Sequence, residues 1–204
     1  MGLATYIAFV VISLGVLIFP GPSILLIVAN SLQRGRIIGL YTVFGGFWAM
    51  LAQLGFAIGG LNSIDAVSAA GFQAVRWAGV AFLIYLGVQR WRGSSQGELR
   101  GRVVTGYRSA IVEGFVVALT NPGTLLFFVA FFPQFVNNSA EVFPQLLLLG
   151  TTFMVLTVIV DCGYAWFAAM VGDRLHKKKQ RKTRQRLAGA LLIVAAFALA
   201  AVNL

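Results

Sequence analysis

Long apolar stretches alternate with short polar segments along the whole chain of 204 residues. Each stretch is about as long as the 20 or so residues that cross the hydrocarbon core of a bilayer as a helix. The pattern predicts six membrane-spanning helices, near residues 3–29, 37–61, 72–91, 109–136, 146–171 and 187–204. We therefore expect an all-α polytopic membrane protein in which residues 1–204 form a single membrane domain.

Basic residues mark three of the five connecting loops. Of the 16 lysines and arginines, 8 lie between Arg174 and Arg186 and 5 between Arg90 and Arg108, while Arg34 and Arg36 follow the first span. The second and fourth loops are nearly neutral. Because cytoplasmic loops are enriched in basic residues, the first, third and fifth loops are expected in the cytoplasm and both termini outside.

The polar segment at residues 92–108 is the longest between spans and divides the chain into two halves of three spans each. We take it as a cytoplasmic linker between repeat one, residues 3–91, and repeat two, residues 109–204. Since each half has an odd number of spans, the halves enter the membrane from opposite sides. This arrangement is an inverted repeat, which is common in transporters.

The first and fourth spans share a helix-breaking motif. The first contains FPGPSILLIV at residues 19–28, and the fourth contains NPGTLLFFVA at residues 121–130. Interrupted helices at matching positions of an inverted repeat indicate a transport site near the middle of the membrane. The alternative, a pair of packing kinks, remains open because proline and glycine are common in membrane helices. The candidate substrate-binding residues are Pro20, Gly21, Pro22, Asn121, Pro122 and Gly123.

Local chemistry indicates what such a site would bind. Proline lacks a backbone N–H group, so the carbonyls near Val16 and Leu17 should lose their partners, and Pro22 suits the first turn of a new helix. Asn121 can cap a helix that starts at Pro122, whose free N–H groups would suit a carboxylate. Freed carbonyls would suit an ammonium group. The expected partner is a small zwitterion.

Two carboxylates lie inside the apolar spans. Asp161 falls at about mid-depth in the fifth span, where an ionisable group is a candidate functional site; we expect it to carry the coupled proton, with a structural hydrogen bond as the alternative. Glu113 lies near the start of the fourth span, and there we expect an acid that complements the helix dipole. Gln53 and Asn30 could line a path or join neighbouring helices.

Composition excludes several other classes of protein. The chain is 59% hydrophobic and 11% charged, too apolar for a water-soluble globule. Its net charge of +10 comes from the loops and argues for membrane topology rather than nucleic-acid binding. One cysteine, Cys162, and one histidine, His176, offer no metal site, catalytic pair or cofactor site, so we expect no enzyme. The interacting molecules are then protons, membrane lipids and the substrate.

The motifs PGP in the first span, QRGRIIGL after it and NPGTLLFFVAFFPQF in the fourth resemble those of the lysine-exporter and homoserine/threonine-exporter family. The resemblance covers the whole chain. It implies a bacterial inner-membrane protein that exports amino acids or their derivatives, driven by the proton gradient. It also implies that Pro20, Gly21, Pro22, Asn121 and Pro122 belong to the translocation path. One departure is Gly123, where members of the family usually have lysine, and this difference leaves open a substrate other than an ordinary amino acid.

We therefore expect a secondary exporter of a small amino acid or amino-acid derivative that works by proton antiport. An exporter of another small solute or ion remains the alternative, with a membrane-embedded enzyme a weaker one. The sequence leaves open the identity of the solute, the coupling ion and whether the chain works alone or as a homo-oligomer.

Overall fold

The computed structural model describes residues 1–60, 77–78, 80–88, 106–121, 124–125, 127–137, 139–174 and 181–200. Over these residues the chain is helical, and no strand occurs in them. The helices are α1 (Leu3–Ile18), α2 (Pro22–Arg34), α3 (Arg36–Gly60), α5 (Tyr107–Leu119), α7 (Val142–Arg174) and α8 (Arg181–Ala200). Short π and 3₁₀ helices, η2 (Phe127–Phe131) and η3 (Phe132–Phe135), precede α7, and residues 77–78 and 80–88 are also helical.

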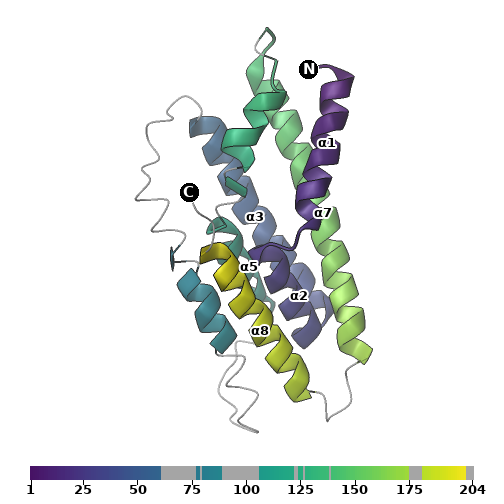
Figure 1. The fold of residues 1–204 in the computed structure, drawn as a ribbon, viewed down its shortest axis with the longest axis vertical. Coiled ribbons are helices and arrows are strands. Elements are labelled where there is room, and N and C mark those ends of the chain that lie inside the picture. Colours follow the sequence, from purple (N-terminus) through teal and green to yellow (C-terminus); the bar gives the residue numbers. More distant parts are fainter. Residues whose placement is uncertain are drawn as a thin grey trace.

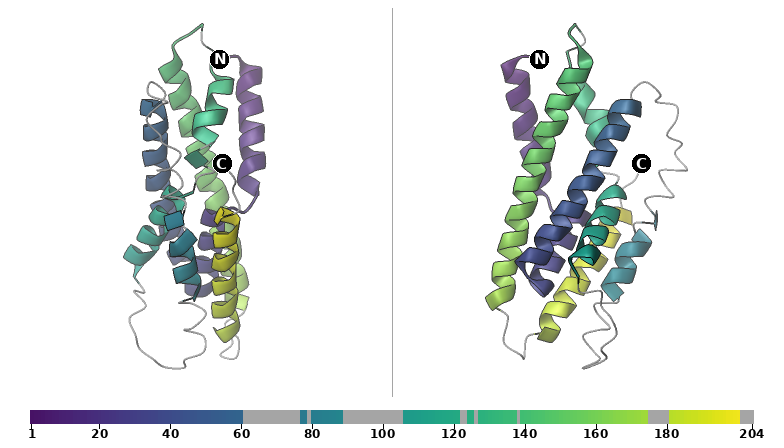
Figure 2. Two further views of the ribbon diagram at one scale, coloured as in Figure 1. Left: turned by 60° about the vertical axis from the view of Figure 1, so that its left-hand side comes forward. Right: turned by 180° about the vertical axis from the view of Figure 1, so that it is seen from behind.

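The helices run roughly along one long axis (Figure 1). α3 and α7 extend over most of its length, whereas α1 occupies the upper half and α2, α5 and α8 the lower half. The opposite views in Figure 2 show the end of α7 and the start of α8 at the same lower end of the molecule. These helix ends flank the most basic loop of the sequence.

Some of the described helices are long enough to cross a membrane. Two helical segments, Arg36–Ile58 and Val142–Asp173, are long and apolar enough to cross a membrane. The pair Leu3–Ile18 and Pro22–Arg34 passes the same test together, with a bend of 55° between its two helices. A shorter apolar helix covers Arg186–Phe197. The described residues thus contain two or three candidate spans, and the described part of the third expected span is the helical residues 77–78 and 80–88.

The two large apolar clusters of the described residues lie at different heights in the bundle. The lower one joins α2, α5, α8 and the helix at residues 80–88 through residues such as Leu26, Leu83 and Leu192. The upper one joins α1, α3, α7, η2 and η3, and it is rich in phenylalanine: Phe9, Phe128, Phe132 and Phe153 are all buried. The rings of Phe127 and Phe153 stack with centroids 4.6 Å apart. The phenylalanine run of the fourth span therefore contributes to the core.

Close contact between α3 and α5 depends on two glycines. A Cβ atom on Gly114 would collide with the backbone carbonyl of Thr42, and one on Gly45 would collide with the carbonyl of Ile111. Glycine at such positions lets membrane helices approach until their backbones touch. This contact fixes the second half of the chain against the first at the level of the polar residues described below.

We predict that Gly114→Ala destabilises the protein, because overpacking a close contact costs about 1–3 kcal/mol. The matched control is Gly55→Ala on α3, where a Cβ would meet no other atom within 4 Å. Thermal unfolding followed by size-exclusion chromatography in detergent should show a clear loss for Gly114→Ala and none for Gly55→Ala. Equal melting temperatures for the two variants would contradict the contact.

Candidate functional site: a cavity between interrupted helices

A cavity of about 390 Å³ lies in the middle of the bundle, between the two large apolar clusters. Its lining comes from α1, α2, α3, α5 and α7 and from the segment after α5. Four of the residues expected at the site line it: Gly21, Pro22, Asn121 and Asp161. Pro20 is exposed and is not part of the lining. Pro122 and Gly123 lie outside the described residues.

Two backbone carbonyls at the end of α1, those of Val16 and Ile18, have hydrogen-bond donors in the structure. α1 ends at Ile18, and α2 restarts at Pro22, which occupies its first turn, as the sequence predicts. The Val16 carbonyl accepts the N–H group of Phe19 at 3.3 Å, so the expectation that it loses its partner was wrong. The Ile18 carbonyl accepts the Tyr164 hydroxyl of α7 at 2.7 Å. A side chain thus replaces a helical hydrogen bond that the prolines prevent.

Gly21 leaves open space beside the start of α2. Its backbone is extended, with φ −78° and ψ −178°, and a Cβ placed on it would meet nothing within 4 Å. This open space agrees with the expectation that Gly21 belongs to a substrate-binding site. The first residues of α2, Pro22, Ser23 and Ile24, also line the cavity. The N-terminal end of a helix carries a partial positive charge, which favours an anionic group nearby.

Gln53 lies close to the backbone carbonyls at the C-terminal end of α5. Its Nε2 group lies 3.2 Å from the carbonyl oxygen of Ala118, 3.1 Å from that of Leu119 and 3.3 Å from that of Asn121. Since a polar group without a partner is costly in hydrocarbon, this side chain stabilises a helix end at membrane depth. Its Oε1 atom is buried and has no hydrogen-bond partner. Gln53 also lines the cavity, so it serves both purposes considered for it.

Asp161 is the one charged side chain among the described residues that line the cavity. It lies on α7 and is 9% exposed. In the part of the chain that the structure describes, its carboxyl group has no hydrogen-bond or ion-pair partner. The alternative of a structural hydrogen bond to a neighbouring helix is therefore not supported there. The side chain is available to a ligand or a proton.

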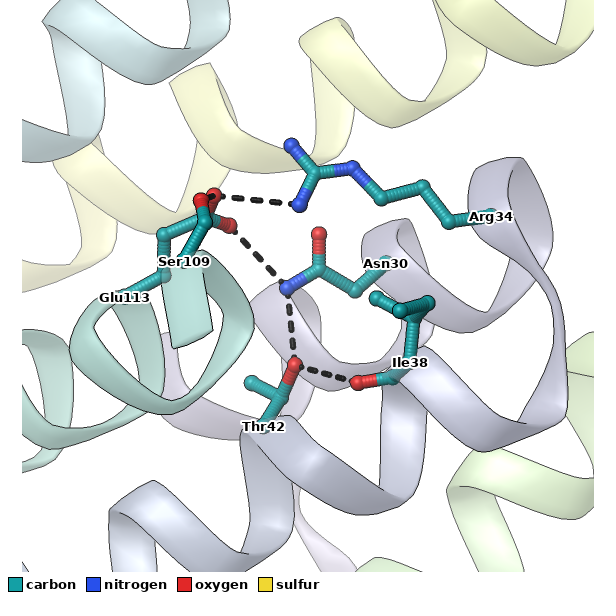
Figure 3. A network of polar contacts seen from close by, with 6 residues as sticks. All are labelled: Asn30, Arg34, Ile38, Thr42, Ser109 and Glu113. Atoms are coloured by element: carbon teal, nitrogen blue, oxygen red, sulfur yellow. Dashed lines mark hydrogen bonds and ion pairs between the residues drawn. The ribbon is translucent and has the colours of Figure 1, made fainter. Parts of the chain in front are cut away.

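A polar network joins α2, α3 and α5 next to the cavity, whose lining includes its member Thr42 (Figure 3). Glu113 accepts hydrogen bonds from Arg34 at 3.1 Å, Asn30 at 3.1 Å and Ser109 at 2.8 Å. The same Asn30 amide also donates to Thr42 at 2.8 Å. The expected role of Glu113 as a first-turn acid was wrong, because α5 begins at Tyr107 and its first turn contains no acidic residue. Its negative charge instead balances Arg34, whose side chain is partly buried.

Arg34 is the functional residue that sequence reasoning missed. Its position after the first span made it a topology signal, but its side chain is only 14% exposed and pairs with Glu113. A possible signal was present: Asn30 and Arg34 are four residues apart and so share a helix face, and Glu113 supplies the only acid in the apolar part of the fourth span.

The lining suits a small amphiphilic solute. Most of it is apolar, with Leu26, Val43 and Phe127 among its members, and hydroxyl or amide groups are spread through it: Ser23, Thr42, Gln53, Asn121, Thr124 and Thr157. The start of α2 offers partial positive charge and Asp161 a carboxylate. No cluster of three or more metal-ligating side chains occurs in the described residues.

Comparison with known proteins decides the family. The model of the LysE type translocators matches residues 14–202, nearly the whole chain. The chain belongs to the LysE-type translocator family.

Named relatives of this translocator come from several bacteria. A homoserine/homoserine lactone efflux protein of Salmonella typhimurium is 30% identical over 172 residues, covering 84% of this chain and 82% of the relative. A leucine efflux protein of Salmonella choleraesuis is 27% identical over 202 residues, 94% and 92% of the two chains. An uncharacterized membrane protein of Vibrio cholerae is 28% identical over 197 residues, 95% of each. No solved structure gives a significant match.

The hydrogen bond from Tyr164 to Ile18 can be tested by removing one hydroxyl group. We predict that Tyr164→Phe lowers the stability of the translocator by about 1 kcal/mol, the net value of a typical hydrogen bond, or more because the carbonyl is left without a donor. Tyr85→Phe makes the same chemical change at a side chain that is 60% exposed. Thermal unfolding in detergent should separate the two variants, and the account of the first interruption fails if it does not.

Proposed function

We propose that this translocator exports a small amino acid or amino-acid derivative from the cytoplasm by proton antiport. The observation that supports this most is the central cavity, which is lined by the start of α2, by residues that follow α5 and by a buried carboxyl group that has no partner in the described part of the chain. Two relatives named as efflux proteins, for homoserine or homoserine lactone and for leucine, support the amino-acid class.

The charges around the cavity suggest how a zwitterion would lie in it. Its carboxylate would face the start of α2, where the N–H groups of Ser23 and Ile24 belong to the first helical turn. Its ammonium group would face Asp161. The carbonyls at the end of α5 are less available than expected from the sequence, because Gln53 already donates to them. This placement differs from the expectation from the sequence, in which the free N–H groups of a helix that starts at Pro122 would bind the carboxylate.

A single carboxyl group shared by substrate and proton would couple their movements. When Asp161 faces the cytoplasm, an ammonium group would bind to it after the proton leaves. When it faces the outside, a proton would replace the ammonium group and release the substrate. Two ligands that compete for one site in this way cannot cross together, which is the requirement for exchange. The proton gradient then drives the substrate outward.

The proposed topology is six spans in two inverted three-helix repeats, in the inner membrane of a bacterium, with both termini outside. It is supported by the interruption between α1 and α2 and by the end of α5 at the same cavity. The end of α7 and the start of α8, which flank the most basic loop of the sequence, lie at the end of the molecule that would face the cytoplasm. Catalysis is less favoured, because the family is one of translocators. An exporter of another small solute is the second candidate, since Gly123 replaces the lysine common in the family.

Transport by purified protein in proteoliposomes tests this proposal, with radiolabelled homoserine and leucine as the first substrates. The wild-type protein should move one of them against its gradient when a proton gradient is imposed. Asp161→Asn should abolish this uphill transport, because an amide cannot carry the proton. Exchange of labelled for unlabelled substrate should persist with a raised KM, since the amide oxygen still accepts a hydrogen bond.

Asp173→Asn is the matched control for this experiment, because Asp173 lies on the same helix, is exposed and does not line the cavity. It should retain uphill transport. Full gradient-driven export by Asp161→Asn would refute the coupling role. No movement of any amino acid by the wild-type protein, with another solute transported instead, would favour the second candidate.

A further inference from the structure

The network around Glu113 separates two hollow regions of the molecule. On one side Thr42 belongs both to the network and to the lining of the central cavity. On the other side Arg34 belongs both to the network and to a second hollow of about 400 Å³, next to the turn between α2 and α3. The hydrogen bonds of Asn30 and Glu113 therefore link a residue that lines one hollow to a residue that lines the other.

The network is buried on the side of the central cavity, whereas Arg34 is 14% exposed at the second hollow. Asn30 is 0% exposed, Thr42 1% and Glu113 5%. The helices around it also pack without space between them: a Cβ on Gly114 of α5 would collide with Thr42 of α3, and one on Gly172 of α7 would press on the Leu32 carbonyl of α2. No substrate can pass here unless the helices separate.

The ion pair joins elements that the sequence assigns to different halves of the protein. Arg34 is the last residue of α2, the inner part of the first interrupted span, and Glu113 lies on α5, the inner part of the fourth. Movement of one half against the other at this end must therefore break the contact between these two side chains. The closest hydrogen bonds between α2 and α5 in the network all involve Glu113.

An ion pair that is largely removed from water contributes little to the stability of a protein by itself. Removing two charges from water costs several kcal/mol per ion, and the attraction between them roughly repays that cost. Such a pair has a small net energy when it is closed and can regain hydration when it opens. It is therefore suited to a contact that forms and breaks, whereas a permanent contact would be served as well by apolar side chains.

We propose that Arg34 and Glu113 form the inner gate of the translocator, the contact that closes the cavity toward the basic end and must break to admit substrate from the cytoplasm. Asn30 and Ser109 are positioning residues that hold the Glu113 carboxylate toward Arg34. The role of this gate in a transport cycle rests on the proposed function. Closure of the cavity by the ion pair does not depend on that function.

Cysteine accessibility tests the gate directly. Ser23 lines the cavity at the start of α2, and Ser23→Cys exchanges one small polar group for another. In a Cys162→Ala background this cysteine is the only thiol of the chain. A membrane-impermeant maleimide is added in turn to each face of sealed vesicles. From the face with the basic loops, labelling should be slow with Arg34 and Glu113 intact and at least ten-fold faster after Arg34→Gln or Glu113→Gln.

Arg36→Gln is the matched control. Arg36 also lines the second hollow, but its guanidinium lies over the Trp166 ring, 5.8 Å from the ring centroid, and not in the network. Its removal should leave labelling slow. Arg34→Lys, which keeps the positive charge, should label more slowly than Arg34→Gln. If Arg34→Gln does not fold, as judged by size-exclusion chromatography, Ser109→Ala supplies the test, because it removes one hydrogen bond to Glu113 and should raise the labelling rate.

Equal labelling rates in the Arg34→Gln and Arg36→Gln variants would overturn the gate, as would rapid labelling from the basic face with the pair intact. Either result can occur in a protein that exports amino acids normally, so it leaves the proposed function standing. Conversely, a protein that shows the labelling difference and transports no amino acid would retain the gate and lose the proposed substrate.

Discussion

Backbone polarity inside a membrane is the constraint on which this structure depends. Hydrocarbon supplies no hydrogen bonds, so a helix can be interrupted there only where protein or a polar cavity satisfies the exposed N–H and C=O groups. The translocator meets this requirement with side chains from helices of the other half of the chain: Tyr164 for the end of α1 and Gln53 for the end of α5. The start of α2 is left facing the cavity. The interruptions are thus both stabilised and partly open, which is what a transient binding site needs.

Two different kinds of contact lie on either side of that cavity. Toward the upper end, phenylalanine rings of α1, η2, η3 and α7 pack against one another. Toward the lower end, an ion pair and its amide and hydroxyl partners join α2, α3 and α5. The first contact is apolar and non-directional, while the second depends on charge and on hydrogen-bond geometry. A single substitution that hardly changes the volume of a side chain can therefore break the polar contact by removing a charge or a hydrogen-bonding group.

The sequence carried much of this architecture. The proline–glycine motif of the first span predicted an interruption next to Pro22, the residue at which α2 begins. The carboxylate in an apolar span indicated Asp161, which lines the cavity. The repeat of the motifs could be seen because it is local in sequence. The second motif at Pro122 and Gly123 stays a prediction, since it lies outside the described residues.

What the sequence did not reveal depends on contacts between distant segments. Arg34 and Glu113 are 79 positions apart, and each had a plausible local role, as a topology signal and as a helix-dipole partner. Only the packing of α2 against α5 shows that they neutralise each other. Gln53 is similar, because its donor group has a purpose only once α3 lies against the end of α5. Pairing across helices cannot be inferred from the periodicity of either helix alone.

The central claim is that the two interruptions, far apart in sequence, face one cavity that holds the substrate. Cross-linking of Ser23→Cys to Thr124→Cys, with Cys162→Ala in the background and a short bifunctional thiol reagent, tests it most directly. Both positions line the cavity, and each follows the proline–glycine pair of its own half. We expect efficient cross-linking within the monomer, and protection by an amino acid that the protein exports. Absence of cross-linking in folded protein whose two thiols each react with a monofunctional reagent would contradict the account.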